Sequence, residues 1–247
     1  MFARLLIMFY AITGYGAFLV SFVWALGFVG NYDRLASKSI DSGAAGNPVE
    51  AVVVDVLLLA LFALQHSVMA RPAFKRWWTR IIPAAAERST YVLLSSLVLL
   101  LLFWQWRPIP ISVWRVEGLA ANVLTGIHWL GWLTVLSSTY MIDHFDLSGL
   151  RQAFFAVRGE AAPAPSFRTP LLYRLVRHPL MLGFLLAFWA TPDMTVGHLL
   201  FAALNTAYIL IGLQFEERDL IAVFGESYQR YRQRVPMLLP RLFGRQA

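Results

Sequence analysis

The chain has 247 residues, of which 58% are hydrophobic and 14% are charged, whereas an average soluble domain has about 25% charged residues. This composition argues against a soluble domain. A net charge of +7 would also fit a nucleic-acid ligand, but in so apolar a chain basic residues are typical of the cytoplasmic face of a membrane protein, so no nucleic-acid partner is expected. Because the chain has no cysteine, disulfides, thiolate metal sites and cysteine nucleophiles are excluded.

Four apolar segments are long enough to cross a bilayer, which takes about 20 mostly apolar residues in a helix. They are residues 5–30, 49–70, 91–106 and 119–142. The third is short and is expected to extend back into Glu87 or Arg88. The first is too long for the apolar core of a signal peptide, so we expect it to be retained.

A fifth apolar region, residues 180–215, is too long for one crossing, because a straight helix over it would reach about 54 Å. Thr191-Pro192-Asp193 interrupts the region, and proline cannot continue a helix interior. The sequence therefore predicts a helical hairpin made of residues 180–190 and 196–214.

The distribution of basic residues supports this hairpin. If the four helices and the hairpin alternate across the membrane, one side holds 17 of the 21 lysines and arginines and the other holds four. With a single crossing in the last region, the split becomes 11 to 10 and the usual excess of positive charge on the cytoplasmic side is lost. The prediction is a multi-pass protein of the cell (inner) membrane with both termini cytoplasmic.

The expected fold is an all-α integral membrane protein, formed by one polytopic domain over residues 1–247. Four transmembrane helices precede the C-terminal hairpin, which gives five to six spanning segments, and a short cytoplasmic helical tail follows. Residues 159–166, which contain Ala-Pro-Ala-Pro, are expected to form a flexible or extended linker.

Polar residues gather at the predicted cytoplasmic ends of these segments, where ionisable groups are costly and tend to be functional. Gln65 and His66 end the second segment. Tyr140, Asp143, His144 and Asp146 end the fourth segment. Four more lie at the two ends of the hairpin: Arg177, His178, Glu216 and Glu217.

One of these groups has the spacing expected of a general base and a side chain that orients it. Tyr140 lies three residues before Asp143 and four before His144, so on a continuous helix the three share one face. Asp143 or Tyr140 would then orient His144 as a general base. Ordinary helix-end polarity is the alternative for this group, and a simple interfacial hydrogen bond is the alternative for His66. Haem ligation by His66 and His144 is a further alternative; no other metal is expected.

The most specific motif lies between Leu175 and Pro240. It reads Arg177-His178-Pro179, Gly183, Glu216-Glu217-Arg218-Asp219-Leu220, Phe224-Gly225, Tyr228, Tyr231, Val235-Pro236 and Leu239-Pro240. In order and spacing it resembles the C-terminal signature of the isoprenylcysteine carboxyl methyltransferase superfamily. Two positions depart from that pattern, because Met181 stands in place of a tyrosine and Met237 in place of an arginine, which weakens the case for a prenylcysteine substrate.

This resemblance implies a membrane-embedded pocket for S-adenosylmethionine, built from the hairpin and tail and open to the cytosol. The candidate cofactor residues are Arg177, His178, Pro179, Glu216, Glu217, Tyr228 and Tyr231. The guanidinium can pair with the carboxylate of the cofactor, and the imidazole can form a hydrogen bond near it. Either glutamate can bind the ammonium group or the ribose hydroxyls, and the two tyrosines can present aromatic surface to the adenine or the sulfonium.

The N-terminal half resembles one particular family within this superfamily. Residues 61–75 and the run from Tyr140 to Leu147 are similar to bacterial methanethiol S-methyltransferases, within an NnrU-like group of membrane methyltransferases. This similarity implies an enzyme of sulfur metabolism that converts methanethiol and S-adenosylmethionine to dimethyl sulfide and S-adenosylhomocysteine. Residues 1–145 would then carry the substrate site and residues 146–247 the cofactor site.

Methyl transfer to sulfur requires a thiolate, because the thiol is the poorer nucleophile. We expect His144 or His66 to accept the thiol proton, with Asp143 or Tyr140 fixing the imidazole tautomer. Gln65 and Asp146 complete this candidate catalytic group, which is expected to face the cofactor pocket.

Three other functions remain open from the sequence. A carboxyl or lipid methyltransferase would share the same cofactor half. A membrane reductase of similar C-terminal layout would bind NADPH instead. A non-enzymatic NnrU-like assembly or haem-handling protein is the third.

Overall fold

The computed structural model describes residues 1–164 and 166–240. Contacts between Cα atoms divide the described chain into two compact units. Unit 1 comprises Met1–Arg115, Asp143–Ala164 and Asp193–Phe201, and unit 2 comprises Val116–Ile142, residues 166–192 and the described residues from Ala202 onward. Pro165 of the expected linker, and two of the counted C-terminal arginines, Arg241 and Arg245, lie outside the described residues.

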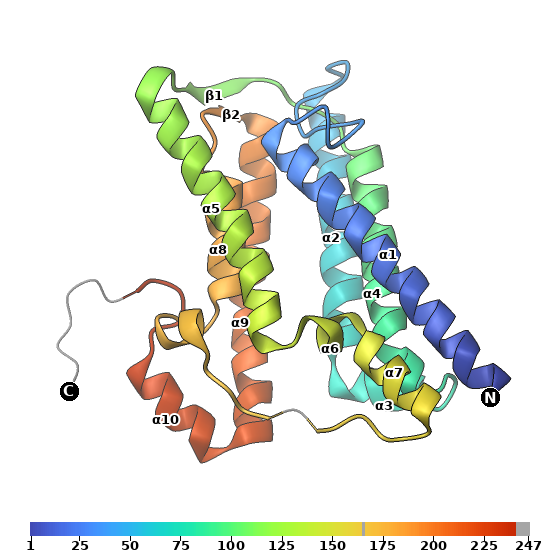
Figure 1. Ribbon diagram of the computed structural model, residues 1–247. Coiled ribbons are helices and arrows are strands. Elements are labelled where there is room, and N and C mark those ends of the chain that lie inside the picture. The colour runs from blue at the N-terminus through green and yellow to red at the C-terminus, as the bar shows by residue number, and fades with distance from the viewer. Residues whose placement is uncertain (165, 241–247) are drawn as a thin grey trace. The chain divides into compact units, whose positions relative to one another are not determined.

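Unit 1 contains six helices over its described residues. They are α1 (Phe2–Gly30), α2 (Pro48–Ala70), α3 (Pro72–Trp78), α4 (Ala84–Gln105), α6 (His144–Ser148) and α7 (Leu150–Arg158). Helix α4 packs against both α1 and α2, and the short α7 lies against α1 and α4 (Figure 1). Helix α4 begins at Ala84, so the expected extension of the third segment toward Glu87 is confirmed.

Local sequence explains where these helices begin. The Asn47 side chain accepts a hydrogen bond from the backbone of Val49 at 2.9 Å, and Pro48 occupies the first helical position of α2. A second proline, Pro72, starts α3 directly after α2 ends. The Asn47 side chain thus satisfies a backbone N–H group that the bilayer core could not, and the two prolines occupy positions where no N–H is needed.

An aromatic core closes one end of unit 1. The ring of Phe28 lies 4.7 Å from Phe103, 5.7 Å from Trp106 and 5.8 Å from Phe201 between centroids. Phe28 and Trp106 are fully buried. The tilted Phe28–Phe103 contact and the edge-to-face contact of Phe28 with Trp106 stabilise the packing of α1 against α4.

The structure adds a small sheet that the sequence analysis did not predict. Strands β1 (Ser112–Arg115) and β2 (Asp193–Thr195) pair antiparallel. Arg115 Nη2 lies 2.7 Å from Asp193 Oδ2 across this pair. Strands of three and four residues are too short for an alternating pattern to show, and the remaining elements of the described chain are helical, as expected.

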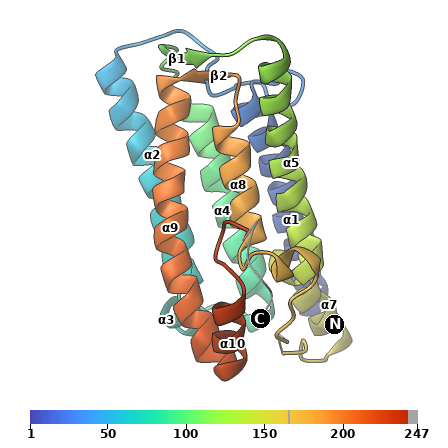
Figure 2. The same ribbon diagram turned by 90° about the vertical axis from the view of Figure 1, so that its left-hand side faces the viewer.

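Unit 2 holds the C-terminal hairpin. Its elements are α5 (Gly118–Ile142), the 3₁₀ turn η1 (Leu171–Arg174), α8 (Pro179–Trp189), α9 (Val196–Phe224, of which the first turn belongs to unit 1) and α10 (Glu226–Arg234). Figure 2 shows α8 and α9 side by side, and Trp189 Nε1 donates a 2.9 Å hydrogen bond to Thr206 Oγ1 between them. The predicted break near Pro192 is confirmed, although α9 continues to Phe224 rather than ending at residue 214.

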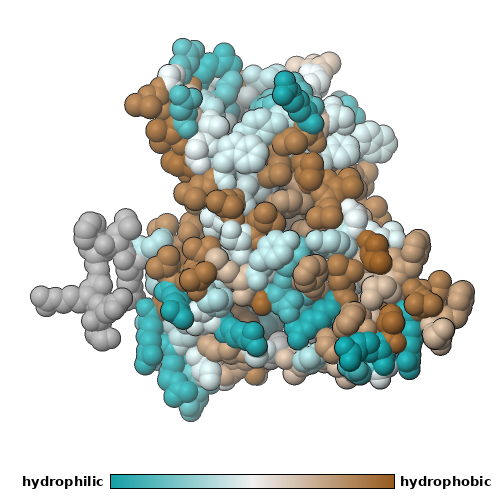
Figure 3. Space-filling model, in the orientation of Figure 1, coloured by the Kyte–Doolittle hydropathy of each residue, from teal (hydrophilic) through white to brown (hydrophobic). Residues whose placement is uncertain are grey.

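Five helices of the described chain are long and apolar enough to span a bilayer: α1, α2, α4, α5 and α9. Helix α8 has 11 residues and reaches about 16 Å, roughly half of the hydrocarbon core. Large apolar side chains such as Phe9 and Leu57 are mostly exposed on these helices, and Figure 3 shows hydrophobic surface over the long helices and hydrophilic surface over α10. The chain is a multi-pass integral membrane protein.

Candidate active site

A buried carboxylate organises the polar residues of unit 2. Glu217, on α9, accepts a hydrogen bond from Arg177 Nε at 2.7 Å and lies 2.6 Å from Arg177 Nη2. Both side chains are only 9% exposed. Arg177 Nη1 donates to the carbonyls of Arg232 and Val235, at 2.9 and 2.8 Å. The arginine therefore joins the start of α8, the glutamate of α9 and the end of α10.

Three further groups surround the Glu217 carboxylate. His178 Nε2 lies 3.2 Å from Oε1, and Arg232 Nε lies 3.3 Å from Oε2. The Tyr228 hydroxyl donates to Oε1 at 3.5 Å. The neighbouring Glu216 lies 3.7 Å from His178 Nδ1, and its side chain is 46% exposed. One glutamate is thus held inside the protein while the other reaches toward solvent.

The tail segment fixes the position of the Arg-His-Pro motif. The backbone N–H groups of Arg177 and His178 donate to the carbonyls of Pro236 and Met237, at 2.9 and 3.2 Å. Pro179 takes the first helical position of α8 and is fully buried. The motif and the Val-Pro segment, far apart in sequence, therefore form one backbone arrangement.

The two methionines that depart from the superfamily pattern pack against the same apolar cluster. Met181 and Met237 both pack against the apolar cluster formed by Ile209, Leu213 and Leu238. A tyrosine hydroxyl or a guanidinium would lack partners in such surroundings. These positions therefore contribute to the α8–α9 core in this chain.

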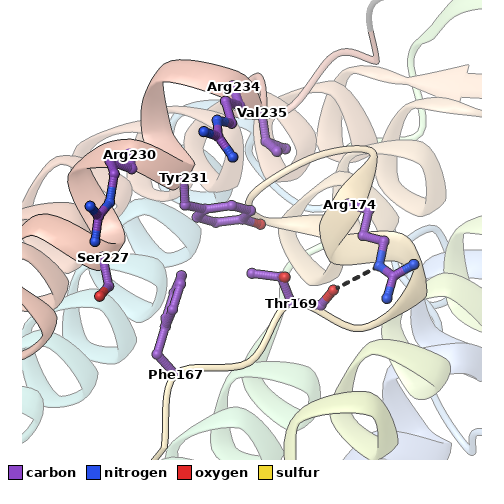
Figure 4. Close-up of a pocket in the computed structure, with 8 residues that line it drawn as sticks. All are labelled: Phe167, Thr169, Arg174, Ser227, Arg230, Tyr231, Arg234 and Val235. Carbon is purple, nitrogen blue, oxygen red and sulfur yellow. Dashed lines mark hydrogen bonds between the residues drawn. The ribbon is translucent and has the colours of Figure 1, made fainter. Parts of the chain in front are cut away.

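Aromatic rings lie next to the Glu217 cluster. The ring centroid of Phe167 is 5.5 Å from Tyr231 and 6.0 Å from Tyr228, and Figure 4 shows Phe167 and Tyr231 facing one open space. The Tyr231 hydroxyl donates to the Tyr173 carbonyl. Burial raises the pKa of Tyr231 to about 12, with the Arg177 charge opposing the shift, and burial also raises the pKa of Tyr228. Both phenols are neutral at physiological pH.

In unit 1 the principal titratable group is His144. It is 5% exposed, and its Nε2 lies 3.0 Å from the Tyr15 hydroxyl of α1. The rings of Phe18 and Phe145 meet the imidazole edge to face, at 6.0 and 5.6 Å between centroids. Burial lowers the pKa of His144 below its ordinary value, and the charge of Asp143 opposes this shift. The imidazole is therefore held in its neutral form, the form that a general base must have before the reaction.

The carboxylates beside His144 have structural partners. The Asp143 side chain accepts a hydrogen bond from the Asp146 backbone N–H at 2.9 Å, which caps α6, and it also pairs with Arg151. Asp146 Oδ1 accepts from Gln152 Nε2 at 3.1 Å. Each carboxylate therefore contributes to the turn between α6 and α7.

The predicted shared face of Tyr140, Asp143 and His144 is wrong. Helix α5 ends at Ile142, and Asp143 is extended, with φ of 179°. The spacing rule applies only within one helix. Tyr140 belongs to α5 in unit 2 and is 57% exposed, and it is Tyr15 whose hydroxyl lies against His144 Nε2.

His66 has its own neighbours between α2 and α4. Its Nε2 lies 2.7 Å from the Tyr91 hydroxyl, and its Nδ1 lies 3.3 Å from the Ser95 hydroxyl. Gln65 Nε2 donates to Met69 Sδ at 3.1 Å. No cluster of three His, Asp or Glu ligands suited to a metal ion occurs among residues 1–164 and 166–240.

Sequence reasoning missed Tyr15, Tyr91 and Arg232 as neighbours of the candidate residues. Tyr15 lies between Gly14 and Gly16 in α1, where small residues permit close helix packing. A Cβ atom at Gly14 would lie 3.0 Å from the Ser89 carbonyl, so the helices do approach closely there. That approach also places the next residue, Tyr15, where it reaches His144.

The two clusters define a helical membrane protein with a buried Arg–Glu–His group in one unit and a part-buried Tyr–His pair in the other. The family model described as NnrU protein matches residues 55–215. Methanethiol S-methyltransferase 2 of Bradyrhizobium diazoefficiens is 70% identical, with 99% of this chain and 94% of the relative covered. The methanethiol S-methyltransferase of Mycobacterium tuberculosis is 56% identical, with 96% and 97% covered.

A more distant relative, Nurim of Bos taurus, is 32% identical over 68% of each chain. No solved structure matches the chain. The chain belongs to the NnrU family, together with the relatives named methanethiol S-methyltransferase.

Proposed function

We propose that the chain is an S-adenosylmethionine-dependent methyltransferase that converts methanethiol to dimethyl sulfide. The observation that carries this proposal is the similarity to relatives named for this activity, which extends over nearly the whole chain. The distribution of basic residues further supports an inner-membrane protein with both termini in the cytoplasm.

The polar group of unit 2 has a donor set that fits the cofactor. Glu216, whose side chain is 46% exposed, offers a carboxylate for an ammonium group or ribose hydroxyls, and Tyr231 offers aromatic surface next to a cation. Glu217, His178 and Tyr228 are buried against one another and support these groups from behind. When bound, S-adenosylmethionine supplies an electrophilic methyl group. Arg177 supports this site by holding Glu217 in one orientation.

The Tyr15–His144 pair supplies the proton acceptor. The Tyr15 hydroxyl lies 3.0 Å from His144 Nε2 and holds the imidazole in one orientation, and this imidazole accepts the thiol proton in the proposed reaction. Exclusion of water by Phe18 and Phe145 favours the neutral imidazole before the reaction. Methanethiol has two heavy atoms, so its positioning depends on apolar walls rather than on many polar contacts.

The test is direct. Membranes containing the chain are given methanethiol and S-adenosylmethionine labelled on the methyl group, and the headspace is examined for labelled dimethyl sulfide. Labelled product that is absent from membranes without the chain supports the proposal. If NADPH rather than S-adenosylhomocysteine binds the purified protein in calorimetry, the reductase alternative replaces it.

A further inference from the structure

Unit 2 has an open hollow of about 550 Å³ whose lining is strongly basic. Figure 4 shows the Tyr231 ring at its centre, with Arg230 on one side and Arg174 on the other, and Arg234 close by. Of the candidate cofactor residues in the described chain, Tyr231 is the one that lines it. The volume is within the range of about 300–1,000 Å³ that is usual for ligand sites.

No carboxylate in the described part of the chain forms an ion pair with the arginines of this hollow. Its lining, as far as the structure describes the chain, has three arginines and no carboxylate. Arg230 and Arg234 form no ion pair with residues 1–164 or 166–240. Three guanidinium groups around one space repel each other, so an anion bound between them would lower the electrostatic energy.

The hollow is built by one face of α10. Ser227, Arg230, Tyr231 and Arg234 have the spacing i, i+3, i+4 and i+7, which places them along one side of a helix. Helix α10 begins two residues after the end of α9, a helix long enough to span the bilayer. Basic clusters directly after a spanning helix are typical of contacts with anionic headgroups.

Apolar side chains beside the arginines favour a lipid over a soluble ligand. Leu171 and Leu175 flank Arg174 on the η1 turn, and they are 69% and 57% exposed. Such exposure is costly in water, but it suits the boundary between headgroups and acyl chains. The same turn therefore presents one cation and two apolar side chains.

We propose that this hollow binds the phosphodiester of an anionic phospholipid such as phosphatidylglycerol. Arg230, Arg234 and Arg174 contact the phosphate oxygens, for which the forked guanidinium is well suited. The Ser227 hydroxyl donates a further hydrogen bond, and the acyl chains lie along Leu171 and Leu175. The proposal does not rest on methyl transfer, and of the candidate cofactor residues only Tyr231 borders the hollow in the described chain.

The source of the phosphate is tested with the full chain purified in detergent. Short-chain phosphatidylglycerol, phosphatidylcholine of the same chain length, and inorganic phosphate are titrated separately, and thermal unfolding is followed. Phosphatidylglycerol is expected to raise the melting temperature in a saturable way, with no comparable effect of the other two. Equal stabilisation by inorganic phosphate, or by phosphatidylcholine, would overturn the proposal.

Variants locate the site. Each arginine near anionic lipid contributes about a factor of five to the affinity. Arg174→Gln should therefore weaken phosphatidylglycerol binding about fivefold, and the double variant Arg230→Gln/Arg234→Gln about thirtyfold. The control Arg76→Gln/Arg218→Gln removes the same charge from exposed positions outside the hollow and should change the affinity less than threefold. Equal losses in the two double variants, or no loss in Arg174→Gln, would contradict a defined site.

Discussion

The Tyr15 hydroxyl lies 3.0 Å from Nε2 of His144, although 129 residues separate the two in sequence. Tyr15 comes from the long α1 helix, and His144 from the short α6 helix that packs against it. Because His144 is almost fully buried, this contact holds the imidazole ring in one orientation. In the proposed reaction Tyr15 is a positioning residue, and His144 is the catalytic base.

Tyr15→Phe keeps the ring and removes the contact with His144. We expect turnover to fall about fivefold to tenfold, the effect of one buried hydrogen bond, while affinity for S-adenosylhomocysteine stays unchanged. Dimethyl sulfide release and calorimetry measure the two quantities. The matched control is Tyr10→Phe, which removes a 3.1 Å hydrogen bond to Thr90 from the same helix. A Tyr15→Phe enzyme as active as this control would rule out the positioning role.

The pH dependence of turnover should report the low pKa of His144. Burial lowers this pKa below the ordinary 6.5, so the neutral base persists at more acidic pH than a free histidine would allow. We therefore expect the midpoint of the acid limb of turnover to lie below pH 6.5. The free energy of unfolding should also fall at acidic pH, because His144 binds a proton more tightly in the unfolded chain than in the folded one. The contribution of His144 to stability is therefore fully present above pH 6.5 and declines as the pH falls below it.

His144→Ala tests the same residue without titration. Loss of a general base costs about 10²–10⁴ in rate, with little change in cofactor affinity. A rate profile centred at or above pH 6.5 in the unmodified enzyme, or near-normal turnover in His144→Ala, would assign the base elsewhere, with His66 the next candidate.

Asp143 should matter for folding more than for chemistry. Its carboxylate caps α6 through the Asp146 N–H and pairs with Arg151. Asp143→Ala should therefore lower the free energy of unfolding by about 1 kcal/mol, whereas Asp143→Asn, which can still cap the helix, should lose less. Thermal unfolding in detergent measures both. If Asp143→Asn unfolds normally but loses most of its turnover, the carboxylate has a catalytic role instead.

Hydrophobic length and proline position were enough to predict most of the helices. The four segments and the break at Pro192 depend on chain-local rules of helix length and proline geometry, so they could be found without the structure. The extension of α9 to Phe224 could not, because residues 215–224 are partly charged and their helix is continuous with an apolar one. The small β1–β2 sheet depends on pairing between distant segments, which no local pattern encodes.

The part of the candidate site that depends on local sequence motifs could be predicted as well. The Arg-His-Pro motif lies at the start of α8 and the Glu-Glu motif lies within the last third of α9, and the structure brings Arg177, His178 and Glu217 together. The geometry around His144 could not be predicted, because it depends on where the backbone turns. The extended conformation of Asp143 separates Tyr140 from His144, and the close approach of α1 brings in Tyr15.

Glu217 and Glu216 should respond differently to loss of charge. Glu217→Gln leaves Arg177 buried without its counter-charge, which costs about 3–5 kcal/mol of stability, so both the melting temperature and S-adenosylhomocysteine affinity should fall. Glu216→Gln, with a half-exposed side chain, should keep the melting temperature and weaken affinity about tenfold. His178→Ala should weaken the same affinity strongly. Unchanged affinity in both His178→Ala and Glu216→Gln would remove this cluster from the cofactor site.

Gly183 should be required for the packing of α8 against α5. A Cβ atom there would lie 2.7 Å from the Gly131 carbonyl and 2.8 Å from the Val135 backbone nitrogen, and backbone atoms cannot move aside as flexible side chains can. Small residues that let two helices approach this closely are typical of membrane interfaces. Gly183→Ala should therefore lower unfolding stability by about 1–3 kcal/mol. Gly126→Ala, on α5 with no atom within 4 Å of the added Cβ, should be neutral or stabilising by up to about 1 kcal/mol. Thermal unfolding of the two variants in the same detergent decides the matter, since equal melting temperatures would mean that α5 and α8 do not meet at Gly183.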